Sequence, residues 1–508
     1  MEKIQLQSIL CPDSSICEEE SLYFHRRENE IQYDGYFNLF YIEKWKRYTD
    51  LKHLYLSIKL CGYQTLRLYH NRDCVQKIEL DADVKKNYDI EFPWSQYKDG
   101  VFWFSLVEEQ GAGKHNVEGF YIGVHENPRQ IAIGIDICTY RREEYVLRNL
   151  KVLCERVLEN ENLQVAPHLW GYIIDNGKTL GAYEPVQQYL KEWKEKISVI
   201  PNKNAGGAGG FTRGMLEVLK DKEKRNLTHV VLMDDDAVLE PDLFVRMYGF
   251  LRAVKPEWND IILGGTMMRE DLPYMLYASG ETWSEGLIRN ANKNLDVRDY
   301  ENATCENLLT TQKEKKLYSG WWCCCYSLNV VRDDNLPIPL FLHHDDIEYG
   351  LRNKNNGIVF LNGICVWHRY FEDSLPGSNL YYDIRNNFIE MTQRYDVRNA
   401  KKYIWRFYWK RIAFRLVNNK KDEVYWMVQG AKDFLKGPEW LWKQDAEELH
   451  RKIINNEYDS LIICWHKSIE ICLQLLSYRK EKIVEYQKNI EKYTTKSAWK
   501  QYLKLNKN

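Results

Sequence analysis

The sequence has 508 residues, more than a single hydrophobic core usually supports, so two or three domains are expected. Apolar residues make up 44% of the chain and charged residues 28%, which excludes disordered, collagen-like and coiled-coil chains. The formal net charge of -2 gives no overall attraction to nucleic acid, and we expect no nucleic-acid partner.

The 13 cysteines show neither metal-ligand spacing nor a disulfide framework, and Cys323, Cys324 and Cys325 are adjacent. This usage favours the reducing cytosol. Residues 1–17 lack a basic segment followed by a long apolar one, so we predict no signal peptide, and no apolar window reaches the length of a membrane span. We expect a cytoplasmic protein whose surface is free to lie on the inner face of the cell membrane.

Short β-prone runs separated by turn residues fill the chain from about residue 31 to residue 124. Examples are residues 54–60, 65–69 and 101–107. This pattern is typical of an antiparallel β-sandwich, which we assign to residues 1–128. The sandwich either binds sugar or braces its neighbour, and bracing is the simpler interpretation.

From residue 131 the pattern changes to buried strands that alternate with helices. Strands are expected at residues 131–137, 169–175, 197–201 and 230–233, with helices over 143–158 and after Gly209. The alternation predicts a parallel α/β sheet in a domain spanning residues 129–390. A nucleotide is expected at the carboxyl ends of its strands.

After about residue 387 the chain is predicted to be helical, and we assign residues 391–508 to a third, helical domain. Residues 403–411 interleave aromatic and basic side chains. Such a surface suits an anionic membrane or a lipid-linked acceptor. A helix packed on the catalytic domain, with its lysine stems in solvent, explains the same residues equally well.

The strongest chemical signal is the run of Asp234, Asp235 and Asp236 directly after an apolar strand. Three adjacent carboxylates are costly to hold together unless a cation neutralises them. Mg²⁺ or Mn²⁺ would leave coordination positions open for diphosphate oxygens. His368 follows another apolar segment and is a candidate ligand, which would favour Mn²⁺.

A second acidic cluster, Asp345 and Asp346, follows a proline-rich turn and is expected to open a helix. Capping alone explains one aspartate but not two with Glu348 close behind. An inverting sugar transfer needs one general base to deprotonate the acceptor hydroxyl, and Asp346 is the residue that we assign to it.

A glycine-rich segment, residues 202–214, allows close approach of backbone to a ligand and then begins a helix whose N-terminus suits phosphate. The segment lacks the lysine and hydroxyl pair of a Walker motif and departs from the dinucleotide-binding spacing. We assign Gly207 to the donor site and Arg213 to the charge of the diphosphate.

Together these motifs resemble the family 2 glycosyltransferases of the GT-A fold, and more narrowly the bacterial polymerising galactofuranosyltransferases. The aromatic segment at residues 36–45 is similar to the start of that family's β-sandwich. The resemblance implies an α/β, Rossmann-like GT-A domain flanked by an N-terminal β-sandwich and a C-terminal helical domain.

The resemblance also assigns roles to individual residues. It implies contact with uridine diphosphate by Arg142, Asp175 and Asn176, a donor or metal role for Asp234, and metal binding by Asp236 and His368. It implies an acceptor-side pair at Trp321 and Trp322 and a catalytic-base motif at Asp345 and Asp346. His343 and His344 replace a different residue pair of the family, and we place them on the acceptor side.

The expected function is transfer of galactofuranose from UDP-galactofuranose to a growing, lipid-linked glycan, with inversion and with Mn²⁺ or Mg²⁺ as cofactor. A pyranose or rhamnose nucleotide as donor is the alternative on the same scaffold. A carbohydrate-binding scaffold without catalysis and a nucleotidyltransferase are weaker alternatives. The sequence leaves a homo-oligomer, the acceptor and the linkage open.

Overall fold

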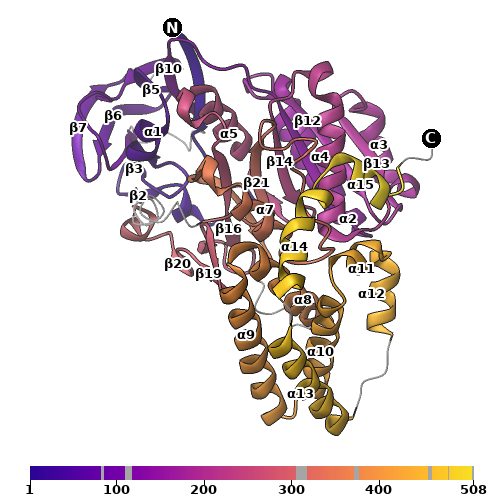
Figure 1. Ribbon diagram of the computed structural model, residues 1–508. Helices are drawn as coiled ribbons and strands as arrows, with labels where there is room; N and C mark the ends of the chain where they lie inside the picture. The colour runs from indigo at the N-terminus through magenta and orange to yellow at the C-terminus, as the bar shows by residue number, and fades with distance from the viewer. Residues whose placement is uncertain are drawn as a thin grey trace.

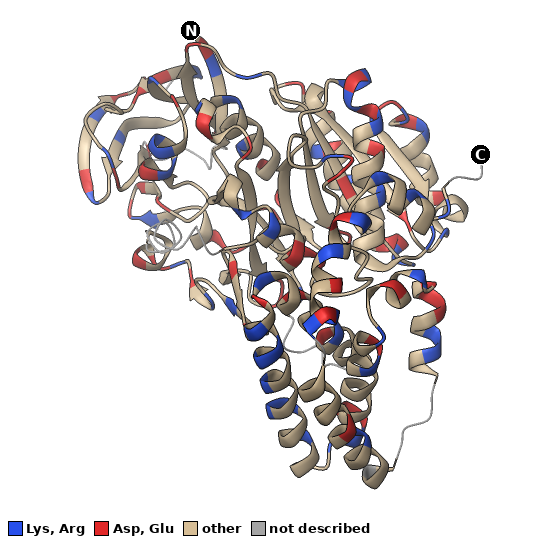
Figure 2. Ribbon diagram, viewed as in Figure 1, with Lys and Arg blue, Asp and Glu red and all other residues tan. Residues whose placement is uncertain are grey.

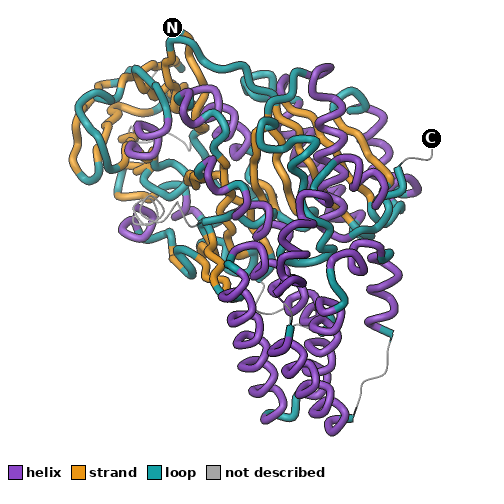
Figure 3. The backbone as a smooth tube through the Cα atoms, viewed as in Figure 1, coloured by secondary structure: helices purple, strands orange, loops and turns teal. Residues whose placement is uncertain are grey.

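The computed structural model describes residues 1–81, 85–108, 117–304, 317–370, 377–455, 460–478 and 480–505. Strand-rich and mixed regions form the upper part of the molecule, and a helical bundle projects below them (Figures 1 and 3). The α/β class with an N-terminal sheet region and C-terminal helices is therefore confirmed.

The N-terminal region is a pair of antiparallel sheets. One has the order β1 (Glu2–Ser8), β10 (Glu118–His125), β5 (His53–Leu60), β8 (Lys86–Glu91). The other has the order β2 (His25–Arg27), β3 (Glu30–Tyr33), β9 (Val101–Glu108), β6 (Tyr63–His70), β7 (Asp73–Glu79), with β4 (Phe40–Tyr41) also on β9. The sheets meet through aromatic stacking, for example between Phe40 and Tyr121, whose ring centroids are 5.3 Å apart. The predicted sandwich is confirmed.

The catalytic sheet begins with four parallel strands in the order β13 (Ile197–Pro201), β12 (Leu169–Asp175), β11 (Ile133–Thr139), β14 (His229–Asp234). The sheet continues through β21 (Cys323–Ser327) and β16 (Ile262–Arg269), which carries β17 (Met275–Ala278), β20 (Leu295–Asp296) and the parallel β22 (Ile358–His368). All the parallel strands end at one edge, so Thr139, Asp175 and Asp234 come together there.

The expectation of an all-parallel sheet is corrected by β21, which runs antiparallel between β14 and β16. Its three cysteines are 0% exposed, and burial raises the pKa of each thiol. They serve as small apolar side chains that pack on both faces of a central strand.

Helices cover the catalytic sheet. They are α2 (Glu143–Lys151), which continues into a π-helical stretch (Val152–Leu158), α3 (Glu184–Glu192), α4 (Gly206–Arg225), α5 (Asp242–Ala253) and α7 (Asp345–Arg352). The helix α4 starts earlier than predicted, at Gly206. On α5 the buried Arg246 donates to Asp242 of its own helix, to the carbonyl of Phe37 and to the carbonyl of Asn362. This guanidinium joins the β-sandwich to the catalytic sheet.

The C-terminal region consists of α8 (Asn379–Arg394), α9 (Val397–Val417), α10 (Lys421–Leu435), α11 (Pro438–Lys443), α12 (Ala446–Ile454), α13 (Leu461–Ser477), α14 (Lys480–Tyr493) and α15 (Lys496–Tyr502). The helix α8 crosses residue 390, and the three domain boundaries stay a prediction.

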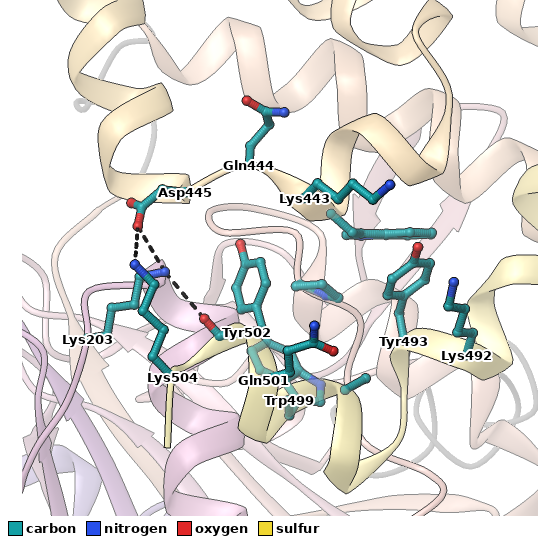
Figure 4. Close-up of a pocket in the computed structure, with 13 residues that line it drawn as sticks. Lys203, Lys443, Gln444, Asp445, Lys492, Tyr493, Trp499, Gln501, Tyr502 and Lys504 are labelled. Atoms are coloured by element: carbon teal, nitrogen blue, oxygen red, sulfur yellow. Dashed lines mark hydrogen bonds and ion pairs between the residues drawn. The ribbon is translucent and has the colours of Figure 1, made fainter. Parts of the chain in front are cut away.

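The chain returns to the catalytic domain at its end. There, the Trp499 indole donates to the carbonyl of Pro337, and Lys203 forms an ion pair with Asp445 at 3.0 Å. Figure 4 shows this junction, where Lys203 and Lys504 both reach Asp445.

Candidate functional site

Three of the predicted metal ligands lie together. One ligand atom from each of Asp234, Asp236 and His368 falls within 4.8 Å of the others. Nε2 of His368 lies 3.1 Å from Oδ1 of Asp236 and 3.9 Å from Oδ2 of Asp234. The short strand β15 (Val238–Leu239) pairs with the end of β22, which holds His368 beside the acids that end β14.

The hydrogen bonds of His368 suit a metal ligand. Nδ1 lies 2.8 Å from the carbonyl oxygen of Arg369, which can only accept, so Nδ1 carries a proton and Nε2 faces the acids. Many metal-binding histidines are oriented in this way by a backbone carbonyl. Two carboxylates and an imidazole nitrogen form a donor set that fits Mn²⁺ and accommodates Mg²⁺.

The charges of this cluster balance each other in the absence of a cation. Burial lowers the pKa of His368, but its hydrogen bond to Asp236 and the charges of both acids outweigh burial and raise that pKa to about 9. Burial raises the pKa of Asp234 to about 7. Burial also opposes ionisation of Asp236, but its hydrogen bond to His368 and the neighbouring cations lower its pKa to about 2. The imidazolium thus occupies the electrostatic position of a cation.

Arg142 lies against the same acids. Its Nη1 donates to Oδ1 of Asp235 at 3.1 Å and to Asp236, while about half of the side chain stays exposed. Asp235 is buried, and its carbonyl accepts from the amide of Asn149 on α2, so this middle acid anchors the loop. The predicted contact of Arg142 with a diphosphate stays a prediction, and its position beside the acids is compatible with it.

The second acidic cluster opens α7, as predicted. Burial raises the pKa of Asp345 and of Asp346, and mutual repulsion adds to the rise at Asp345. The charge of Asp234 also raises the pKa of Asp345, so the two acidic clusters interact. Oδ1 of Asp346 accepts from the backbone amide of Ile347 at 2.7 Å. The two acids sit at a helix N-terminus, where the helix dipole favours negative charge.

The glycine segment packs against both strand and acid. A Cβ on Gly207 would lie 3.2 Å from Oδ2 of Asp345, and one on Gly206 would lie 2.0 Å from the carbonyl oxygen of Phe341. Gly210 and Gly214 leave no room for a side chain against Cys138 and Asp136 of β11. Close helix packing therefore explains most of these glycines, and Gly207 borders the acidic site.

Asp175 and Asn176 end β12 as predicted, and both are buried. The Asp175 carboxylate accepts from the amides of Gly177 and Leu180, which fixes the following turn. The Asn176 amide donates to the carbonyl of Gly206. These bonds tie the strand end to the start of α4, and contact with a nucleotide stays a prediction for both residues.

Other predicted residues lie differently from expectation. Arg213 forms an ion pair with Glu217 of its own helix at 2.8 Å and lines a separate pocket with Lys178 and Lys203. Trp321 and Trp322 are only 4% and 5% exposed, so their ring faces are covered by protein in this structure. Contact of these three residues with donor or acceptor stays a prediction.

The two histidines separate. His343 is exposed and free to meet an acceptor. His344 is buried, and its Nε2 lies 3.1 Å from the amide nitrogen of Asn387 on α8. This burial argues against the predicted acceptor contact of His344.

One acidic residue escaped the sequence analysis. Glu281 begins β18 (Glu281–Ser284), is buried, and has its pKa raised to about 8 by burial and by the charge of Asp346. No motif marks it, because the pairing of residues 281 and 318 that brings it to the site is an isolated long-range bridge.

Comparisons with known proteins agree with this site. Residues 15–117 match the model of the galactofuranosyltransferase 2 N-terminal domain, and residues 135–297 match that of glycosyl transferase family 2. The second match includes Asp234 and Asp236 but ends before Asp345, Asp346 and His368. The chain therefore carries a family 2 glycosyltransferase domain, and the protein is a glycosyltransferase.

The similarity extends over most of the chain. The protein is 24% identical to the galactofuranosyltransferases GlfT2 of Mycolicibacterium smegmatis, over 86% of this chain and 69% of that protein, and of Mycobacterium tuberculosis, over 86% and 70%. Crystal structures of S. aureus TarS 1–349, alone and in complex with UDP, cover 69% of this chain and 93% of theirs. Their identities of 12% and 10% and TM-scores of 0.37 and 0.36 are too low to carry an argument.

The protonation of His368 predicts how Mn²⁺ binding depends on pH. Binding must displace the Nε2 proton below a pKa of about 9, and a second proton from Asp234 below about 7. The dissociation constant should fall about tenfold per pH unit from 7 to 8.5, and more steeply below 7. Electron paramagnetic resonance of free Mn²⁺ measures it.

The His368→Ala variant should bind Mn²⁺ at least about tenfold more weakly and with a shallower pH slope. The matched control is His53→Ala, because His53 is half exposed and pairs with Glu91 on the β-sandwich. A dissociation constant that is flat from pH 6 to 8, or unchanged in His368→Ala, would contradict this metal site.

Proposed function

We propose that the protein transfers galactofuranose from UDP-galactofuranose to a growing cell-surface glycan, with inversion at the anomeric carbon and with Mn²⁺ or Mg²⁺ as cofactor. The observation that carries the proposal is the convergence of two acidic clusters, one with a histidine suited to a metal and one at a helix start. The similarity to GlfT2 supports the choice of sugar.

The donor would lie across the carboxyl ends of β11, β12 and β14. Asp175 and Asn176 would border the nucleoside, and Arg142 would turn from the acids to the diphosphate. Asp236, His368 and Asp234 would hold the divalent ion, which supplies charge neutralisation of the diphosphate leaving group. The proton on Nε2 of His368 is lost when the ion is bound.

Asp346 would remove the proton of the acceptor hydroxyl as that oxygen attacks the anomeric carbon. Its raised pKa makes it a stronger base than an ordinary carboxylate, and the neighbouring acid Asp345 helps to keep that pKa raised. His343 is the exposed side chain nearest in sequence to this acid. We place the acceptor on that side of α7.

The donor is tested by measuring nucleotide release from UDP-galactofuranose, UDP-galactopyranose, UDP-glucose and a rhamnose nucleotide. The acceptor is a synthetic galactofuranosyl oligosaccharide with an apolar aglycone, and each assay is run with Mn²⁺ and then with excess EDTA. We expect release from the furanose donor alone and loss of release with EDTA. Release from another donor alone would discard galactofuranose and keep the enzyme class.

The base is tested in the same assay with Asp346→Asn. Turnover should fall by about 10² to 10⁴, the usual contribution of a general base, while the affinity for UDP stays unchanged. Asp334→Asn is the matched control, because Asp334 is exposed and pairs with Arg332 at the surface. Normal turnover by Asp346→Asn would contradict the assignment.

We also propose that the helical bundle rests on the inner face of an anionic membrane. Most of the exposed large apolar side chains of the described residues lie on α9 and α13, which pack side by side. They are Trp409, Phe414, Val417, Ile462, Ile463, Trp465, Ile469, Leu473 and Leu476. Lys402, Lys410, Lys420 and Lys421 are exposed beside them, and Figure 2 shows the basic side of α9.

An apolar patch bordered by lysines suits a bilayer with anionic headgroups. A hydrogen bond from the Cys464 thiol to the carbonyl of Lys421 places the start of α13 beside the loop between α9 and α10. Among the helices of the described ranges, none combines the length and apolar character needed to cross a bilayer. The proposal is therefore for contact with the surface of the membrane.

Flotation with phosphatidylcholine vesicles, with and without phosphatidylglycerol, tests this contact. The wild type should float with the anionic vesicles, and the double variant Ile462→Ser and Trp465→Ser should partition at least about tenfold less. The matched control is the pair Leu287→Ser and Ile288→Ser, exposed residues of β19 (Leu287–Asn290). Equal partition of all proteins, or loss of an oligomer in place of vesicle binding, would contradict the proposal.

A further inference from the structure

The backbone that leads into the catalytic acids has an unusual conformation. Phe341, His343 and His344 have φ angles of 73°, 62° and 71°, in the left-handed region that non-glycine residues rarely adopt. Residues in such conformations persist when the surrounding structure holds them there. The direction in which Asp345 and Asp346 leave this segment therefore depends on its neighbours.

One neighbour is the start of α4. Gly206 approaches the carbonyl oxygen of Phe341 so closely that a Cβ would lie 2.0 Å from it. This contact closes one side of residues 340–344, which we call the acid-bearing segment.

The other neighbour is α8, where Arg385, Asn386 and Asn387 donate to the acid-bearing segment in succession. Arg385 Nη2 donates to the carbonyl of Leu340 at 2.6 Å. The Asn386 amide donates to the carbonyls of Leu342 and His343, each at 2.8 Å, and the Asn387 amide nitrogen lies 3.1 Å from Nε2 of His344. The three donors are at most 2% exposed, so water does not replace them.

The orientation of both amides is fixed by a second donor. Arg385 Nε donates to Oδ1 of Asn386 at 2.9 Å, and the Trp283 indole donates to Oδ1 of Asn387 at 3.0 Å. Because these groups can only donate, each amide must turn its nitrogen toward the acid-bearing segment. The bonds are therefore directional contacts between the C-terminal helices and the strained backbone.

We propose that Asn386 is a positioning residue for Asp346. Its amide holds the carbonyls of Leu342 and His343 and so keeps the left-handed backbone that directs the acid toward the acceptor. The inference rests on the proposed role of Asp346 as the base. It makes the C-terminal helices part of the transfer step, because the donor of these bonds belongs to α8.

The effect of Asn386 should appear in turnover and not in donor or metal binding. Alanine keeps the helix α8, since it is a strong helix former, but removes both donors. The carbonyls of Leu342 and His343 would then lose a buried partner, and the segment would relax toward ordinary backbone angles. A displacement of about 1 Å at a catalytic group costs about 100-fold in rate.

The test compares Asn386→Ala with Asn489→Ala, an asparagine whose amide bonds a carbonyl of its own helix α14. We expect Asn386→Ala to lose about 100-fold in kcat, with the KM for the nucleotide sugar within about threefold and the affinity for Mn²⁺ unchanged. The control should keep the wild-type kcat. If Asn386→Ala does not fold, as judged by circular dichroism, Asn386→Ser, which keeps one donor, takes its place.

A second variant separates positioning from general loss of packing. Glycine adopts positive φ without strain, so His343→Gly should lower the need for the clamp. The double variant Asn386→Ala and His343→Gly should recover at least about tenfold of the lost kcat, which makes the two changes strongly non-additive. Additive losses, or a wild-type kcat in Asn386→Ala, would overturn the proposal.

The outcomes also separate this inference from the proposed function. If Asp346→Asn turns over normally, the base assignment fails and the clamp has no acid to position. If Asp346→Asn is inactive while Asn386→Ala keeps its kcat, the proposed function stands and only the positioning role is overturned.

Discussion

The arrangement of the site depends on one electrostatic constraint, the cost of holding several carboxylates together at one edge of a sheet. Asp234 and Asp236 end one strand, Asp345 and Asp346 begin a helix, and the charge of Asp234 is felt at Asp345. Such a group persists only if cations offset it. Here the imidazolium of His368 and the guanidinium of Arg142 do so, which is the state expected of an enzyme waiting for a metal ion and a donor.

The second requirement is geometric. The acids of α7 follow a run of left-handed residues that is closed between a glycine of α4 and a row of donors on α8. The catalytic sheet supplies the metal side of the site, and the C-terminal helices hold the base side. The same helices carry the exposed apolar and basic surface that we assign to the membrane, so the surface that faces the lipid and the clamp on the base belong to one helical unit.

Much of this could be predicted from the sequence, because local signals determine it. The strands Leu169–Asp175 and Ile197–Pro201 have the bounds that periodicity indicates, and the predicted trio of Asp234, Asp236 and His368 does come together. The rest depends on contacts between distant segments. The antiparallel β21, the burial of the Trp321 and Trp322 rings, the pairing of Arg213 with Glu217 and the approach of Glu281 to Asp346 are all set by tertiary packing, which a single sequence does not reveal.

The most direct test of the account is the position of the metal ion. Crystals grown with Mn²⁺ and UDP should show one anomalous scattering peak at the manganese edge, within about 2.3 Å of Nε2 of His368 and of a carboxylate oxygen of Asp236. In the same crystals Arg142 should have left the acids for the diphosphate. A peak elsewhere, or no peak in crystals that contain UDP, would contradict the central claim that these side chains form the metal centre of the transferase.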